Sequence, residues 1–177
     1  MRRTLAILFL GTSIVLTQAG TASADTATVT ANVTAGSIGL RSLTSVPAVT
    51  LTPALGQATV TGAMSAVVTE AAVTGTNPWS VTASISPLAL VGQPDIANSN
   101  VAISTRATVQ VSGGGTSTNP TGSEALSAAR TVVSNAGQNT GAVYTGTYTN
   151  SANLALTVPN GTVAGIYTGT LTVTLVQ

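Results

Sequence analysis

Alternation of apolar and polar residues is the feature of this sequence that most limits its fold. Apolar side chains recur at every second position, with gaps, in five stretches: 27–33, 79–85, 101–111, 154–158 and 167–175. A period of two residues places one face of a strand in a core and the other face in water. The pattern is typical of antiparallel sheets with one solvated face, and it predicts a strand in each stretch.

The alternation also predicts which side chains face the core. In 79–85 these are Trp79, Val81, Ala83 and Ile85. In 101–111 the aligned apolar residues are Val101, Ile103, Val109 and Val111, which the same rule places together on one face.

Clusters of turn-forming residues separate the alternating runs, at Thr34–Ser37, Gly75–Pro78, Gly92–Asp95 and Pro159–Gly161. A spacing of roughly ten residues between turns is typical of a β-sandwich and too short for βαβ units. Only 123–130 has a composition compatible with a short helix. We therefore predict an all-β fold, an antiparallel β-sandwich of Ig-like or jelly-roll-like Greek-key type, in one domain.

The first residues have the composition of a secretory signal peptide. Two arginines precede a mostly apolar run over 4–18, and the small residues of Ala22–Ala24 follow it. We predict a signal peptide over 1–24 and cleavage before Asp25, which leaves 25–177 as a secreted β-sandwich domain. A membrane anchor is the alternative, but it needs about 20 apolar residues, and this run is shorter.

Missing residue types exclude several chemistries. The sequence contains no Cys, His or Lys, so it has no disulfide, thiolate nucleophile, Cys/His zinc site, Ser-His-Asp triad or Schiff-base lysine. After cleavage three arginines stand against four carboxylates, a net charge of −1. Without a basic patch we expect no nucleic-acid or membrane partner for the mature chain. We also expect no cofactor.

Polar residues with catalytic or metal-binding potential are few. The mature chain has four carboxylates in all: Asp25, Glu70, Asp95 and Glu124. A glycosidase needs two carboxylates that face each other, and no such pairing is visible in the sequence, so we expect no enzymatic activity. Asp95 shares a loop with Asn98 and Asn100. A turn cap explains this loop better than a calcium site, which needs more carboxylates. The Gly-rich stretch 112–122 lacks the lysine of a phosphate-binding loop and predicts a flexible surface loop.

Aromatic residues are the candidates for ligand contacts. Trp79, the only tryptophan, opens an alternating strand. It is interpreted as a core anchor or, alternatively, as a partly exposed ring that stacks on sugar. Tyr144 and Tyr148 lie on the same side of a strand, where they either form an aromatic platform or fill the core with their hydroxyls hydrogen-bonded. Tyr167 is a further candidate.

Three segments carry a resemblance to a known family. The N-terminal strand reads ATVTANVTAGSIGL, the middle block VTEAAVTGTNPWSVTASISPL and the C-terminal block LALTVPNGTVAGIYTGTLTVTL. Over 26–177 the chain resembles the WxL-type cell-surface domain of Gram-positive bacteria, in its divergent high-GC form. Trp79-Ser80-Val81 occupies the first W-x-L position and Val173-Thr174-Leu175 the second. The chain departs from the pattern at Val81, where the family has Leu, and at Val173, where it has Trp.

The C-terminal block carries the longest part of this resemblance. The family stretch runs V-P-x-G-T-x-A-G-x-Y-x-x-x-L-T-W-T-L. The matching residues are Val158, Pro159, Gly161, Thr162, Ala164, Gly165, Tyr167, Leu171, Thr172, Thr174 and Leu175.

The resemblance implies a secreted, non-catalytic protein of the cell surface. It would associate non-covalently with peptidoglycan or another cell-wall glycan, or with other surface proteins. The implied binding residues are the two motifs and the candidate aromatics: Trp79, Ser80, Val81, Val173, Thr174, Leu175, Tyr144, Tyr148 and Tyr167.

Two other functions remain open from the residues themselves. A self-assembling surface-layer or coat component is favoured by the low charge, the mean hydropathy of +0.45 and strand edges without charged residues. A flat Thr-x-Thr face could order water or ice, although the irregular spacing of the Thr-x-Thr runs argues against this function.

Overall fold

The computed structural model describes residues 27–34, 41–44, 49–51, 59–74, 78–112, 115–137, 143–163 and 165–176. The predicted signal peptide, 1–24, lies outside these residues. The strands within them are β1 (Ala27–Thr34), β2 (Arg41–Thr44), β3 (Val49–Leu51), β4 (Thr59–Thr74), β5 (Trp79–Ile85), β6 (Val101–Ser112), β7 (Ser117–Thr118), β8 (Glu124–Ala125), β9 (Arg130–Asn135), β10 (Val143–Thr157) and β11 (Thr168–Val176). One 3₁₀ turn, η1, spans Asn98–Asn100.

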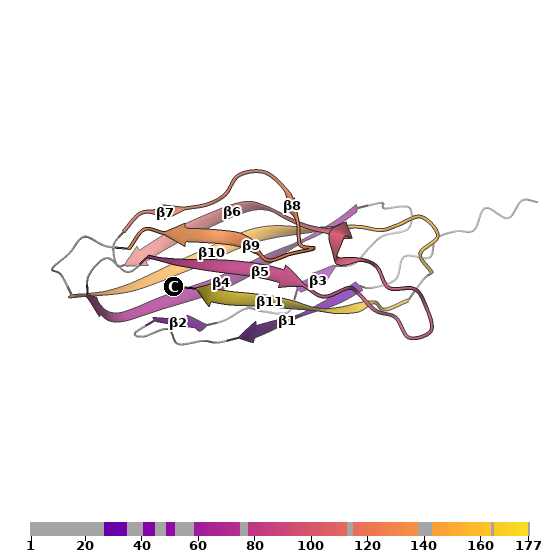
Figure 1. The fold of residues 1–177 in the computed structure, drawn as a ribbon, viewed down its shortest axis with the longest axis horizontal. Coiled ribbons are helices and arrows are strands. Elements are labelled where there is room, and N and C mark those ends of the chain that lie inside the picture. The colour runs from indigo at the N-terminus through magenta and orange to yellow at the C-terminus, as the bar shows by residue number, and fades with distance from the viewer. Residues whose placement is uncertain are drawn as a thin grey trace, which may run out of the picture.

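The strands form two sheets that pack face to face. Sheet A has the strand order β3-β1-β11-β5-β9-β7 and sheet B the order β2-β4-β10-β6-β8. Figure 1 shows β5, β9 and β11 of sheet A in front of β4, β6 and β10 of sheet B. The rings of Trp79 on β5 and Tyr148 on β10 meet across the interface, edge to face, with centroids 5.1 Å apart. The prediction of an all-β sandwich is confirmed.

Successive strands alternate strictly between the two sheets. Every odd-numbered strand belongs to sheet A and every even-numbered strand to sheet B, so no strand pairs with its neighbour in sequence. The pairing of β1 with β11 is parallel, with Thr30 opposite Thr170, and the other strand pairs are antiparallel. The period-2 pattern predicted the strands, but it carries no information on this parallel pair, because burial of alternate residues is the same in both directions.

The core is built from the inward faces of paired strands. On β5 and β11 the register places Val81 opposite Leu175 and Ala83 opposite Val173, and all four side chains are buried. The burial pattern of β5 alternates over its whole length, as the sequence predicted. Full burial of a Val, Leu or Ile side chain contributes about 1.5–3 kcal/mol, so these rows supply much of the force that joins the sheets.

The stretch 123–130, the only helix candidate in the sequence, is not helical. Glu124 and Ala125 form β8, which pairs with Ile103 and Ala102 of β6. The backbone N–H of Leu126 donates to the carbonyl of Val101, and its side chain is fully buried. Pairing with an existing strand and burial of Leu126 outweigh the weak helix preference of a short segment. Among the described residues, no helix is long and apolar enough to cross a bilayer.

Candidate functional site

The two motif segments, more than ninety residues apart in sequence, lie side by side in sheet A (Figure 1). Trp79–Val81 opens β5, and Val173–Leu175 lies near the end of β11. Because the two strands are antiparallel, Val81 stands directly opposite Leu175. Both segments therefore reach the same end of the sandwich.

Most motif side chains point into the core. Trp79 is 3% exposed, and Val81, Val173 and Leu175 are also buried. The prediction that Trp79 faces inward with its strand is confirmed, and its ring does not present an open face for stacking. Only the hydroxyls of the motifs, Ser80 and Thr174, lie on the outer face of the sheet, where they are partly exposed.

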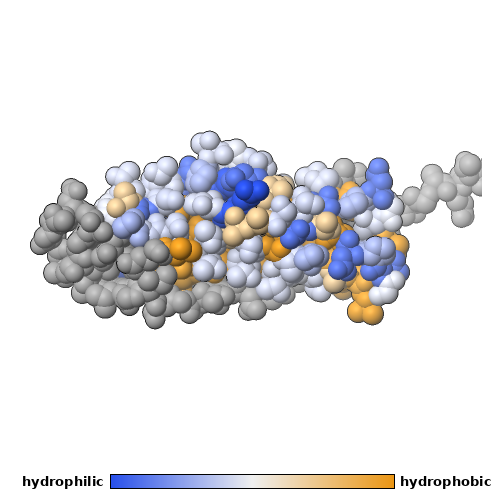
Figure 2. Space-filling model, viewed as in Figure 1, coloured by the Kyte–Doolittle hydropathy of each residue, from blue (hydrophilic) through white to orange (hydrophobic). Residues whose placement is uncertain are grey.

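These two residues belong to a larger set of hydroxyls, which we call the hydroxyl face. Its members are the outward hydroxyl residues of β5 and β11: Ser80, Thr82, Ser84, Thr168, Thr170, Thr172 and Thr174. Thr82 pairs with Thr174 and Ser84 with Thr172, so the hydroxyls form rows roughly 4.8 Å apart across strands and about 6.7 Å apart along them. Figure 2 shows this side of the molecule as mostly pale, with a deep-blue area above the centre and small orange patches among the pale atoms.

A shallow pocket of about 400 Å³ adjoins the hydroxyl face at Ser80; we call it the Trp79 pocket. Its lining residues are Pro78, Trp79, Ser80, Thr118, Ser134, Asn135, Ala136 and Val176. Val176 is 41% exposed, and Ser134 is exposed on β9. The wall thus combines apolar surface with hydroxyl and amide groups, and no ionisable residue lines it.

Trp79 carries an unsatisfied donor in the wall of this pocket. Its indole N–H is buried and makes no hydrogen bond in the part of the chain that the structure describes. Tryptophan N–H groups usually find a partner when they are buried, and a missing partner costs free energy. Asn135, in the same wall, is satisfied: its Nδ2 donates to Ser117 Oγ, and its Oδ1 accepts from the N–H of Gly137.

Tyr148 does not contribute to an exposed aromatic platform. Tyr148 is fully buried, and its hydroxyl donates to Glu70 Oε2 at 3.1 Å. Core filling with a bonded hydroxyl is therefore the correct interpretation of Tyr148. Tyr167 is also a core residue, 4% exposed. The side chain of Tyr144 lies outside the described part of the structure, so its predicted role stays a prediction.

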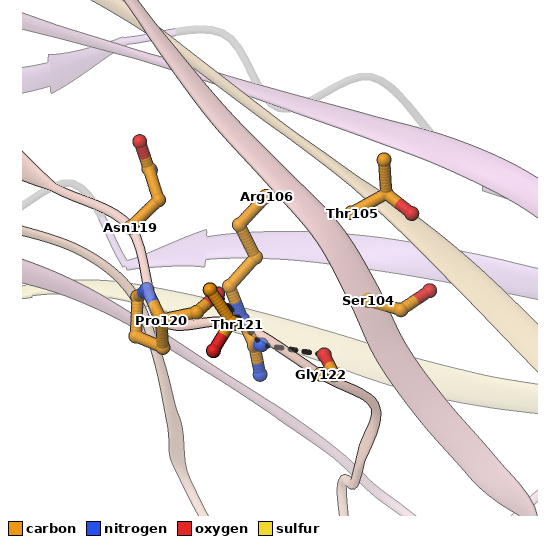
Figure 3. A pocket seen from close by; sticks show the side chains of 7 residues that line it. All are labelled: Ser104, Thr105, Arg106, Asn119, Pro120, Thr121 and Gly122. Atoms are coloured by element: carbon orange, nitrogen blue, oxygen red, sulfur yellow. Dashed lines mark hydrogen bonds between the residues drawn. The ribbon is translucent and has the colours of Figure 1, made fainter.

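A second pocket, which the sequence did not indicate, lies beside Arg106 in sheet B. It has a volume of about 320 Å³, and Ser104, Thr105, Arg106, Asn119, Pro120, Thr121 and Gly122 line it (Figure 3). Residues 119–122, which belong to the stretch predicted as a flexible loop, 112–122, therefore form part of the wall of this pocket.

The loop around Asp95 shows a structural role for one of its amides. Asn98 Nδ2 donates to the carbonyl of Ile85, which ties η1 to the end of β5. Asp95 itself is exposed. Within the described ranges, no three His, Cys, Asp or Glu residues lie close enough to hold a metal ion.

Comparison of the chain with protein-family models, with curated proteins and with solved structures finds no match.

Proposed function

We propose that this protein is a secreted, non-catalytic surface protein that associates non-covalently with peptidoglycan or another cell-wall glycan. The observation that carries the proposal is the direct pairing of the two W-x-L-like segments beside the Trp79 pocket. The resemblance to the WxL family, which links wall binding to these two motifs, supports the same conclusion.

The chemistry of the pocket suits sugars. A sugar ring offers apolar C–H patches and a rim of hydroxyls. Pro78 and Val176 supply apolar contact, while Ser80 and Ser134 supply hydrogen bonds. The hydroxyl face continues from Ser80 along β5 and β11, so a glycan chain longer than one ring has further hydroxyls to contact.

The distribution of the carboxylates supports a binding role without a catalytic step. Glu70 is buried in the core against Tyr148, and Glu124 is paired with Arg106 at 2.5 Å. Neither carboxylate lines the Trp79 pocket. Two facing carboxylates, which glycoside hydrolysis requires, are not present in that pocket.

Co-sedimentation with purified cell-wall sacculi tests the proposal. We expect the protein to pellet with sacculi and to pellet equally at low and high salt, because uncharged contacts are not screened. Ser134→Arg places a bulky side chain in the Trp79 pocket and should reduce binding severalfold. Ser151→Arg adds the same charge on the exposed outer face of β10 and should bind as the parent does. Equal binding by both variants, or no binding by the parent, would contradict the proposal.

One observation favours a second function, self-assembly into a surface layer. Val109 and Val111 on β6 are 62% and 69% exposed. In the described part of sheet B, β8 pairs only with Ala102 and Ile103, so the rest of β6 pairs with β10 alone. An exposed apolar edge without charge is a template for strand addition between copies.

Sedimentation velocity as a function of concentration separates the two functions. Assembly predicts growth of the sedimentation coefficient with concentration in the absence of sacculi, promoted by high sulfate. Val111→Lys should abolish that growth. If the protein is a monomer at all concentrations, self-assembly is excluded and glycan binding remains.

A further inference from the structure

Strand β6 contains a strained residue beside the Arg106 pocket. Thr105 has a φ of +47°, the left-handed region that β-branched residues rarely adopt. The register with β10 shifts here, from Ser104 opposite Asn153 to Ala107 opposite Ser151. Two residues of β6 thus face one residue of β10, which defines a β-bulge.

The bulge reverses the direction of the side chains that follow it. Arg106 turns inward and its side chain is fully buried, at 0% exposure. Its Nη1 donates to the carbonyls of Pro120 and Gly122, at 3.3 and 3.1 Å, and its Nη2 donates to Glu124 Oε2. Its Nε–H has no acceptor among the described residues. Strained backbone beside an unsatisfied buried donor is typical of a functional site rather than of a structural pin.

The pocket beside Arg106 presents hydroxyl groups that are free to bind. Figure 3 shows Ser104, Thr105 and Arg106 on β6, with Asn119, Pro120, Thr121 and Gly122 on the segment that crosses it. The hydroxyls of Ser104, Thr105 and Thr121 make no hydrogen bond within the described structure. Asn119 donates through Nδ2 to Thr108 Oγ1 and to the carbonyl of Val132, which holds the segment in place.

Charge decides between a neutral ligand and an anion. The positive charge of Arg106 is already compensated by Glu124, which also lies 3.7 Å from Arg130 Nη1. A second anion would meet the field of that carboxylate, so the pocket favours an uncharged ligand. The groups that it offers to a ligand are three hydroxyls, which donate and accept. Neighbouring hydroxyls of a sugar also both donate and accept hydrogen bonds, so they match these groups.

We infer that the Arg106 pocket is a binding site for one neutral sugar ring, separate from the Trp79 pocket. The volume of about 320 Å³ lies at the lower end for small-molecule sites, which suits a single ring. No aromatic residue lines it, so affinity is weak, with a dissociation constant on the order of millimolar. The inference does not depend on wall binding, because the two pockets share no lining residue.

Amide chemical-shift titration of the whole protein tests this site. Glucose and N-acetylglucosamine should shift the amides of Ser104–Arg106 and of Asn119, Thr121 and Gly122 in a saturable way. The double variant Ser104→Ala/Thr121→Ala should bind severalfold more weakly. Both positions lie on the surface side of the pocket and are not core residues. Ser127→Ala, in the exposed turn after β8, is the matched control and should bind normally.

Three results would overturn the inference. They are the absence of saturable shifts with either sugar, shifts produced by inorganic phosphate but not by sugar, and unchanged sugar affinity in the double variant. Loss of pelleting with sacculi while the glucose shifts persist would remove only the wall-binding proposal. Pelleting without glucose shifts would remove only this site.

Discussion

Single residues in this protein show how far an alternating pattern can be trusted. Trp79 was expected inward from its phase in the strand, and it is inward, against the ring of Tyr148. The sequence could not predict that its indole N–H lacks a partner, because the residues around Trp79 come from β7 and β9, which are distant in sequence and line the same pocket. Glu70 points inward from β4. Because Glu70 occupies one of the inward positions of β4, the apolar alternation of this strand is interrupted, and the sequence does not predict the strand.

Replacement of Trp79 tests the core role at this scale. Trp79→Ala should lower the free energy of unfolding by about 3–5 kcal/mol, because it leaves a cavity between the sheets. Trp79→Phe should cost less, about 1.5 kcal/mol or under, since it keeps most of the ring and removes a donor that has no partner. Chemical denaturation monitored by circular dichroism measures both values.

Controls on the other face of the same strand complete this test. Ser80→Ala and Thr82→Ala change partly exposed hydroxyls and should stay within about 0.5 kcal/mol of the parent. A parent-like stability of Trp79→Ala would show that the ring is not a core anchor.

At the scale of the element, strand β6 shows where the alternating pattern fails. Val101 and Ile103 are buried as predicted, but the prediction that Val109 and Val111 share their face is wrong. The bulge at Thr105 inserts one residue, and a shift of one residue exchanges the two faces of a strand. Neither Gly nor Asn marks the left-handed position, so nothing local in the sequence signals the bulge. Arg106 and its pocket were missed for the same reason.

Relief of the strain in the bulge is therefore a test of this element. Asn adopts the left-handed region more readily than Thr, and Thr105 is exposed. Thr105→Asn should raise the free energy of unfolding by about 1 kcal/mol. Thermal unfolding detects this as a higher Tm.

The matched comparison is Thr157→Asn, at an exposed position of β10 outside the bulge, which should not stabilise the protein. A lower Tm for Thr105→Asn than for the parent would mean that Thr105 is not strained.

The whole molecule depends on pairings between distant parts of the chain. Strands β1, β5, β6, β10 and β11 could be predicted, because alternation is a local property. Strand order could not, because it depends on contacts such as β1 with β11. Two of the Thr-x-Thr runs meet on these two strands, with Thr30 opposite Thr170. The spacing of turns predicted a sandwich, but it gave no sign that each turn leads to the opposite sheet.

Removal of β11 tests this dependence. The strand lies between β1 and β5, so its loss leaves two central edges unpaired and opens the core at Leu171, Val173 and Leu175. A chain that ends at Tyr167 should show no cooperative unfolding transition. Addition of a peptide that spans 168–177 should restore a transition, whereas a peptide with Val173→Asp should not. A cooperative transition in the shortened chain alone would contradict the central role of β11.

The position of β11 also determines when, during synthesis of the chain, the sheets can form. A ribosome delivers the chain from its N-terminus, and many domains fold while they emerge. Here β1 and β5 are made early, but the strand that joins them is the last one described. Neither sheet can close by adding sequence neighbours one after another, because no two consecutive strands among those described pair with each other. The nascent chain therefore stays open until β11 has been made, and it depends on protection from aggregation until then.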